Sequence, residues 1–206
     1  MNLSESLAEL RKISKKRNFD QTVDLIINLK DFDPRKDSLN TFAILPHLNL
    51  NKKIAAFLEN PSPQVYSITK KDIEKITNAD LKRLIKEYDF FIANAKLMPI
   101  IAQKFGKILG TSGKMPDPKM GGVLLQENEE IIKEVVERLS KTVKIKAKEP
   151  SLKIAIGKES MPDQKIIENA NIVIKTVIEA LPKRELNLRS IMLKFTMSKP
   201  VKIKLK

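Results

Sequence analysis

Residues 105–122 read FGKILGTSGKMPDPKMGG, and they decide between two kinds of protein. Gly106, Gly110 and Gly113 stand among lysines and prolines, which is the composition of a loop that can wrap a phosphate group. If this loop binds phosphate, the chain is a nucleotide-dependent enzyme of the α/β class. If it does not, the function must be sought elsewhere in the sequence.

The spacing of the glycines excludes both common phosphate-binding patterns. A Walker-type loop ending at Gly113 and Lys114 would need a glycine in place of Ile108 and a hydroxyl residue in place of Met115. The dinucleotide pattern G-x-G-x-x-G fails because no two of the three glycines are two positions apart. The stretch also follows an expected helix, 96–105, and not a strand. An ordered surface loop is therefore expected, with glycines at positive φ and prolines for stiffness, and cradling of a phosphate by its backbone stays open as the minor alternative.

Around this stretch the sequence alternates strands and helices. The apolar runs IAAFL, QVYSI and FFIAN predict strands covered on both faces, and VKIKAK predicts an edge strand. Helical spacing of apolar residues predicts helices over 70–88, 96–105 and NEEIIKEVVERLSK. Such alternation is typical of a parallel α/β unit. We therefore expect residues 51–150 to form an inserted α/β lobe.

The outer segments, 1–50 and 151–206, follow a different pattern. A first helix, with Ser4 as its expected N-cap, carries apolar residues at helical spacing: Leu3, Leu7, Leu10 and Ile13. A strand is predicted by alternation of Val23, Leu25, Ile27 and Leu29. NTFAILP, LKIAIG, LRSIMLKFTM and VKIKLK predict further strands, and DQKIIENANIVIKTVIEAL predicts a long helix. The outer segments are expected to form an α+β sheet with helices on one side.

Composition favours a polyanionic partner. The 206 residues carry a formal net charge of +14, with a pI near 9.8, and lysines that neutralise phosphates release condensed counterions. The basic runs are RKISKKR and the C-terminal segment with Lys194, Lys199, Lys202, Lys204 and Lys206. The alternative for the last three lysines is a charged strand edge that prevents aggregation.

Several classes of chemistry lack their residues. The chain has no cysteine and one histidine, His47, which excludes disulfides and Cys/His zinc sites, and no nucleophile elbow accompanies that histidine. No apolar run approaches the roughly 18–20 residues that span a bilayer, and the N-terminus lacks the apolar region of a secretory signal. The sequence predicts a cytoplasmic protein without a membrane partner, metal or cofactor.

Five segments resemble one known family. LGTSGKMPDPKMGG is similar to the LGPRGLMPNPK-G signature of the universal large-subunit ribosomal stalk protein family, with Thr111 and Ser112 in place of a proline and an arginine. KRNFDQTVDLIINLKDFD, TFAILPH, KIAIGKESM and LRSIMLKFTMSKPVKI resemble further motifs of that family, in the same order. The matches cover nearly the whole chain, and the first strand has the form of archaeal members.

The resemblance implies a fold of two lobes. Both termini, 1–50 and 151–206, would form an RNA-binding α+β domain, and 51–150 would be an inserted Rossmann-like α/β/α domain without a nucleotide. This division agrees with the changes of pattern near residues 51 and 150. The resemblance also implies that the protein is not an enzyme. The competing class is a nucleotide-dependent enzyme that uses the α/β lobe.

The resemblance further implies an rRNA site on the terminal domain. Its residues would be Asn18, Phe19, Gln21, Thr22, Asp24, Gly157, Lys158, Ser190, Thr196, Met197, Ser198 and Lys199. Hydroxyls, amides and main-chain groups on one sheet can hydrogen-bond to phosphate and to the 2′-hydroxyl that distinguishes RNA from DNA. Two alternatives stay open: Phe19 as a core aromatic residue, and Asp24 as a solvated strand carboxylate.

The implied function is that of a ribosomal component. The protein would bind large-subunit rRNA at the mobile stalk beside the exit site, would assist movement and release of the tRNA there, and would repress translation of its own mRNA. The free protein is expected to be a monomer, and the working protein to be ribosome-associated.

The chain departs from the family pattern at two places. Ser198 replaces a glycine that would allow close approach of RNA or a positive φ. Leu48 and Leu50 replace glycines at the junction between the lobes, which puts hinge flexibility in doubt. His47, next to that junction, is expected to be structural, with RNA contact as the alternative.

Overall fold

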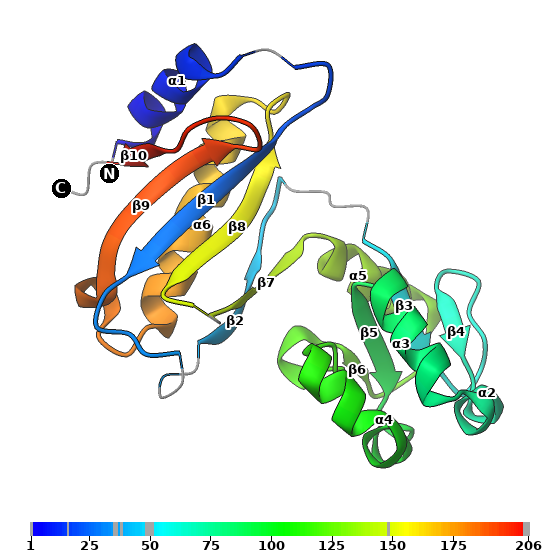
Figure 1. Cartoon of the computed structure of the whole chain (residues 1–206). Helices are drawn as coiled ribbons and strands as arrows, with labels where there is room; N and C mark the ends of the chain where they lie inside the picture. Colours follow the sequence, from blue (N-terminus) through cyan, green and yellow to red (C-terminus); the bar gives the residue numbers. More distant parts are fainter. Residues whose placement is uncertain are drawn as a thin grey trace. The chain divides into compact units, whose positions relative to one another are not determined.

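The computed structural model describes residues 2–15, 17–34, 37, 39–47, 52–147 and 149–203 (Figure 1). The chain divides into two compact units. The terminal unit combines residues 1–49 with 141–206, and the inserted unit comprises residues 50–140. The described helices and strands together form a mixed α/β protein, which confirms the predicted fold class.

The terminal unit is built on a four-stranded antiparallel sheet in the order β10-β9-β1-β8 (Figure 1). Its strands are β1 (Thr22–Leu29), β8 (Ser151–Lys158), β9 (Leu188–Phe195) and β10 (Val201–Ile203). Its helices are α1 (Leu3–Ile13), α6 (Asp163–Ala180) and the 3-10 turn η2 (Arg184–Asn187). A separate antiparallel pair consists of β2 (Asn40–Ile44) and β7 (Thr142–Lys146).

Among the described elements, helices α1 and α6 cover one face of the four-stranded sheet. The alternating residues Val23, Leu25, Ile27 and Leu29 are at most 4% exposed, as predicted, and lie on the side of the sheet where α1 and α6 pack. The intervening residues of β1, from Thr22 to Asn28, are partly exposed. No helix of the described part covers this second side, which we call the open face.

The first helix differs from the prediction at both ends. Its N-cap is Asn2, and Ser4 lies inside the helix because the helix begins two residues earlier than an N-cap at Ser4 would give. Ile13 is 50% exposed, so the apolar stripe ends at Leu10 and Ile13 does not belong to the core.

The inserted unit contains a parallel sheet in the order β4-β3-β5-β6. Its strands are β3 (Ile54–Phe57), β4 (Tyr66–Ile68), β5 (Phe90–Asn94) and β6 (Val123–Leu124). Its helices are α2 (Lys70–Lys75), α3 (Asn78–Glu87), α4 (Met98–Ser112) and α5 (Glu129–Ser140), with the 3-10 turn η1 (Pro118–Met120). The expected helix over 70–88 is two helices, because Thr77 starts a new one: Asp80 N–H donates to Thr77 Oγ1 at 3.3 Å.

Two apolar cores form on opposite sides of this parallel sheet. On one side, Phe57 and Phe91 of the strands meet Phe105 of α4, with ring centroids 5.8 and 6.4 Å from that of Phe57. On the other, Ile92 of β5 packs with Val135 of α5. Helices on both sides of a parallel sheet make the unit an α/β/α layered structure.

The strand predicted from VKIKAK belongs to the other unit. It was expected at the edge of the α/β lobe, but β7 pairs with β2 in antiparallel register from Asn40↔Lys146 to Ile44↔Thr142. Leu45 N–H also donates to Lys141 O at 2.8 Å. The boundary drawn by contacts therefore lies at 140/141, and not at the predicted 150/151.

The opening stretch, 105–122, is only half a loop. Helix α4 continues to Ser112, so Gly106 and Gly110 are helical residues, contrary to the expected helix end at 105. Gly113 ends the helix in the left-handed conformation at φ 70°, and Gly121 has φ 68° after the turn η1. Positive φ is thus required at two of the glycines. No helix in the described ranges is long and apolar enough to cross a membrane.

Candidate nucleic-acid interface

The lysine of the suspected phosphate loop is used inside the protein. Lys114 Nζ donates to the carbonyl oxygens of Ile85 and Tyr88, at 2.7 and 2.6 Å, where helix α3 ends. Those carbonyls have no partner within the helix, so a lysine there satisfies them. The stretch 105–122 thus braces the inserted unit, and its lysine does not reach outward for a ligand.

The crevice where parallel α/β sheets bind ligands is filled by a carboxylate. Such ligands bind beyond the carboxyl ends of the strands where the strand order reverses, here between β3 and β5. Glu127 lies there and accepts from Glu59 N–H at 2.6 Å, Asn60 N–H at 3.1 Å and Asn94 Nδ2 at 2.6 Å. Burial raises the pKa of Glu127, but these donors outweigh it and hold the pKa below its ordinary value. The donors that an anionic ligand would need are therefore engaged.

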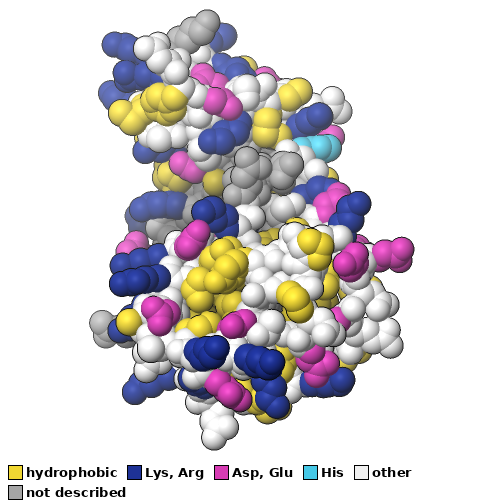
Figure 2. Space-filling model, turned by 90° about the vertical axis from the view of Figure 1, so that its right-hand side faces the viewer, with side chains coloured by type: hydrophobic (Ala, Val, Ile, Leu, Met, Phe, Trp, Pro, Cys, Tyr) yellow, Lys and Arg dark blue, Asp and Glu magenta, His cyan; other side chains and the backbone are white. Residues whose placement is uncertain are grey.

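The positive charge is concentrated in the terminal unit. Its sequence holds 24 lysines and arginines against 13 acidic residues, a net charge of +11, whereas the inserted unit holds 15 against 12, a net charge of +3. On the face drawn in Figure 2, basic and acidic side chains are interspersed. A polyanionic partner is accordingly expected on the terminal unit. Among the described residues no group of His, Cys, Asp and Glu could hold a metal ion.

Part of the predicted site comes together at the start of β1. Thr22 N–H donates to Thr196 Oγ1 at 3.0 Å, and Lys158 Nζ donates to Thr22 Oγ1 at 3.1 Å. Two strands, β1 and β8, and the turn directly after β9 thereby bring two hydroxyls and an ammonium group to one corner of the open face. We call Thr22, Lys158 and Thr196 the hydroxyl corner.

Gln21 supports this corner from below. It is 1% exposed, and its Oε1 accepts from Met197 N–H at 3.1 Å while its Nε2 donates to Glu159 Oε2 at 3.0 Å. The sequence predicted that Gln21 contacts RNA. Its side chain is too buried to do so. Met197, which Gln21 holds in place, is 61% exposed.

The segment before β1 presents an exposed ring. Phe19 is 52% exposed, so the alternative of a core aromatic residue is wrong. Asn18 beside it is also exposed. Asp20 accepts from the N–H and the hydroxyl of Ser160, at 3.0 and 2.8 Å, and so ties this segment to the loop after β8. No local pattern could predict that contact, because Asp20 and Ser160 lie far apart in the chain.

Asp24 lies farther along β1, directly opposite Lys194 of β9. Burial raises the pKa of Asp24, while the charges of Lys194 and Lys158 pull it down. The residue is therefore a half-buried carboxylate between two lysines and not a fully solvated one.

Two predicted residues contribute backbone or turn geometry. At Gly157 a Cβ would lie 3.1 Å from Met161 Sδ and 3.4 Å from Ile166 Cγ1, so this position faces helix α6 and offers the open face no side chain. Ser198 Oγ accepts from Phe195 N–H at 2.9 Å and donates to Lys199 O at 3.1 Å. Ser198 is not among the described residues with positive φ, so the glycine usual in the family is not required here for its backbone freedom. Lys199 is exposed next to it.

Ser190 lies apart from the hydroxyl corner. It pairs with Asn28, at the opposite end of β1 from Thr22, about 20 Å away at the usual rise per strand residue. Asn28 Nδ2 donates to Ser190 Oγ at 2.9 Å, and Ser151 Oγ donates to Asn28 Oδ1 at 2.9 Å. This second polar group was missed, although alternation from Thr22 already places Asn28 on the open face.

His47 is held within the terminal unit. Its Nε2 lies 2.5 Å from Glu168 Oε2 of helix α6, and its N–H donates to Asn169 Oδ1 at 3.4 Å. The structural reading of His47 is therefore favoured over RNA contact. Leu48, Leu50, Lys204 and Lys206 lie outside the described residues.

Comparison with known proteins gives one consistent family. The model of the "Ribosomal protein L1p/L10e family" matches residues 10–199. The chain is 35% identical to "Large ribosomal subunit protein uL1" of Nanoarchaeum equitans, over 92% of this chain and 93% of that protein. It is also 35% identical to the proteins of that name from Thermococcus kodakarensis and Methanocaldococcus jannaschii, over 98% of this chain and 96% and 94% of theirs.

Proposed function

The chain belongs to the ribosomal protein L1p/L10e family, and from this premise we propose that it binds large-subunit rRNA at the mobile stalk through the open face of the terminal unit. As a member of this family it is a structural constituent of the large ribosomal subunit, of the archaeal type, and not an enzyme. The part of the rRNA that it binds, and the residues that make the contacts, are our proposal.

The observation that carries the proposal is the hydroxyl corner with its exposed apolar neighbours. Hydroxyl and ammonium groups from β1, β8 and the turn after β9 stand where they can reach phosphates and ribose hydroxyls, with Phe19 and Met197 exposed close by in sequence. RNA-binding proteins combine these two kinds of contact: polar groups hold the backbone, and apolar side chains meet unstacked bases. The net charge of +11 on the same unit supplies the sequence-independent attraction.

We also propose two roles that follow from stalk binding. At the stalk the protein would help to move and release tRNA from the exit site, as its resemblance to the stalk protein family suggests. The same face would bind the protein's own mRNA, if that message imitates the rRNA site, and would so repress its translation. Both roles depend on RNA binding by the terminal unit.

Binding to a stalk rRNA fragment over a series of salt concentrations tests the proposal. We expect affinity at moderate salt well above that for an unrelated hairpin, and a slope of log K against log salt that reports several phosphate contacts, each adding about 0.7–0.9. Equal affinity for the two RNAs would contradict the proposal. Calorimetry with ATP, GTP and NAD tests the competing class, a nucleotide-dependent enzyme. Binding of any of these nucleotides at micromolar concentrations would favour that class.

A further inference from the structure

The pair of strands β2 and β7 has an outer face that packs on neither of the helices of its unit. The inner residues Ala43 and Ile145 are each 1% exposed. The alternate residues lie on the outer face through the pairs Asn40↔Lys146, Phe42↔Lys144 and Ile44↔Thr142, of which Thr142 is covered, at 3% exposed. Ile44 is 52% exposed there. We call this surface the ribbon face.

The ribbon face combines a ring, an aliphatic side chain and two lysines. Lys144 Nζ lies 5.4 Å from the centre of the Phe42 ring, and Lys146 is exposed one pair along. The six residues of the face include no acidic side chain. Apolar surfaces on which bases lie, flanked by cations that hold the phosphates, are how proteins bind single-stranded RNA.

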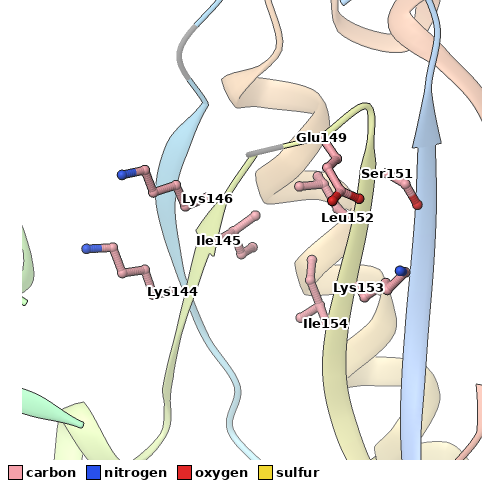
Figure 3. A pocket seen from close by; sticks show the side chains of 8 residues that line it. All are labelled: Lys144, Ile145, Lys146, Glu149, Ser151, Leu152, Lys153 and Ile154. Atoms are coloured by element: carbon pink, nitrogen blue, oxygen red, sulfur yellow. The ribbon is translucent and has the colours of Figure 1, made fainter. Parts of the chain in front are cut away.

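A hollow of about 140 Å³ joins the ribbon face to the four-stranded sheet (Figure 3). It lies between β7 and β8, and its lining includes Lys144, Lys146, Lys153, Ser151 and Glu149. In Figure 3 the side chains of Ile145 and Ile154 lie between the two strands, while Lys144 and Lys146 project from the other side of β7. The side chains that lie between the two strands are therefore apolar, and the ammonium groups of Lys144 and Lys146 belong to the ribbon face.

The hollow also lies next to the second polar group of the open face. Ser151 both lines the hollow and donates to Asn28, which in turn contacts Ser190. The polar residues of the open face thus reach the edge of the hollow at Ser151. A strand of RNA that lies on the open face meets the hollow where β8 forms the edge of the sheet.

We propose that the ribbon face forms a second RNA surface, which takes a single-stranded segment of the same RNA that the open face binds. Bases would lie on Phe42 and Ile44, and phosphates would bind Lys144 and Lys146. The proposal rests on the proposed function, since it assigns to the terminal unit a further part of the same RNA.

Site-directed crosslinking tests this surface. The chain has no cysteine, so Ile44→Cys provides a single attachment point for a photo-crosslinker. Leu186→Cys is the matched control, because Leu186 is an exposed apolar residue, 71% exposed, that is not part of the ribbon face. The probe is a transcript of the large-subunit rRNA stalk region, and complex formation is measured first by gel shift. We expect several-fold more crosslinked RNA from position 44 than from position 186.

The outcomes separate the two proposals. A complex in which position 44 crosslinks no more than position 186 overturns the ribbon face and leaves the open face standing. The absence of any complex with the stalk transcript overturns both.

A salt series gives a second readout that does not depend on the crosslinker. The double variant Lys144→Gln with Lys146→Gln should lower the slope of log K against log salt by about 1.4–1.8, because two phosphate contacts are lost. The control, Lys165→Gln with Lys175→Gln, changes two exposed lysines on helix α6 and should leave the slope unchanged. An unchanged slope in the ribbon variant would count against the proposal even if it bound RNA somewhat less tightly.

Discussion

Phe19 shows at the scale of one residue why exposure decides between structural and functional readings. Its position before a strand fits either a core ring or a base-stacking ring, and sequence alone left both open. The ring is 52% exposed, so covering it with a base would remove apolar surface from water and favour binding. Gln21 gives the opposite result: a residue expected at the RNA surface is buried and holds Met197 in position instead.

Replacing Phe19 tests the stacking role. Phe19→Ala should weaken binding to the stalk rRNA fragment by about 1–3 kcal/mol, the range found when bases lose an aromatic partner. Folding should hardly change, because the exposed ring contributes little to the core. The control is Leu186→Ala, which removes another exposed apolar side chain, 71% exposed, at η2. Similar losses for the two variants, measured by gel shift, would refute a specific role for Phe19.

Lys158 tests the charge of the hydroxyl corner. Lys158→Gln should lower the slope of log K against log salt by about 0.7–0.9, since one phosphate contact is removed. Lys175→Gln, on the exposed side of α6, serves as the control and should leave the slope as it is. If the two variants behave alike, Lys158 does not contact a phosphate.

Glu127 gives a prediction about pH. Its pKa is held below the ordinary value in the folded protein, so its charged form adds stability above about pH 4.5 that is lost as the pH falls through the folded pKa. Glu127→Gln should therefore cost about 1–2 kcal/mol of unfolding free energy at pH 7, and less as the pH falls below about 4.5. Chemical denaturation at several pH values measures this, with the exposed Glu74→Gln as control. A cost that does not change with pH would contradict the account of this carboxylate.

At the scale of elements, some patterns predicted the structure and others could not. Alternation along β1 placed Val23, Leu25, Ile27 and Leu29 in the core correctly, because a strand's period of two is a local property. The predicted end of α4 at residue 105 was wrong. Gly106 and Gly110 lower helix propensity locally, but packing of Phe105 and Leu109 in the core outweighs this effect. The prediction that β7 forms the edge of the α/β lobe was also wrong. Its pairing with β2 joins segments about a hundred residues apart, which no local pattern encodes.

Two glycines of the opening stretch should respond oppositely to alanine. Gly110 is helical with no atom within 4 Å of an added Cβ, so Gly110→Ala should stabilise the protein by about 0.5–1 kcal/mol. Gly121 has φ 68°, and an added Cβ would lie 1.7 Å from Arg138 Nη2, which donates to Met120 O. Gly121→Ala should destabilise the protein by at least about 1 kcal/mol. Thermal unfolding of both variants checks the prediction. A stability change of the same sign for both would contradict the different backbone conformations described for Gly110 and Gly121.

At the scale of the whole molecule, the site could be predicted only in part. The family resemblance indicated the strands that carry it, and three of those strands do meet at the hydroxyl corner. The same resemblance could not separate residues that face a partner from those that support them, such as Gln21 and Gly157, because burial depends on the assembled sheet. Nor could it show that Ser190 lies with Asn28 at the far end of β1.

The division into units leads to a prediction about a truncated protein. Leu45 N–H donates to Lys141 O, so the two terminal segments approach each other where the inserted unit leaves the chain. A protein of residues 1–49 and 141–206, joined by a short flexible linker, should keep most of the affinity for the stalk rRNA fragment, because it holds a net charge of +11 and the open face. The isolated inserted unit, 50–140, should bind weakly. Tighter binding by the inserted unit than by the joined terminal segments would contradict an RNA site on the terminal unit.

RNA crosslinking in cells, followed by sequencing of the RNA recovered with the protein, tests the central claim most directly. We expect most crosslinks to fall in the stalk region of large-subunit rRNA, with a smaller set in the protein's own transcript. We also expect both sets to decrease for the double variant Phe19→Ala with Lys158→Gln. Crosslinks spread evenly over cellular RNA, or stalk crosslinks that are unchanged in the double variant, would contradict this claim.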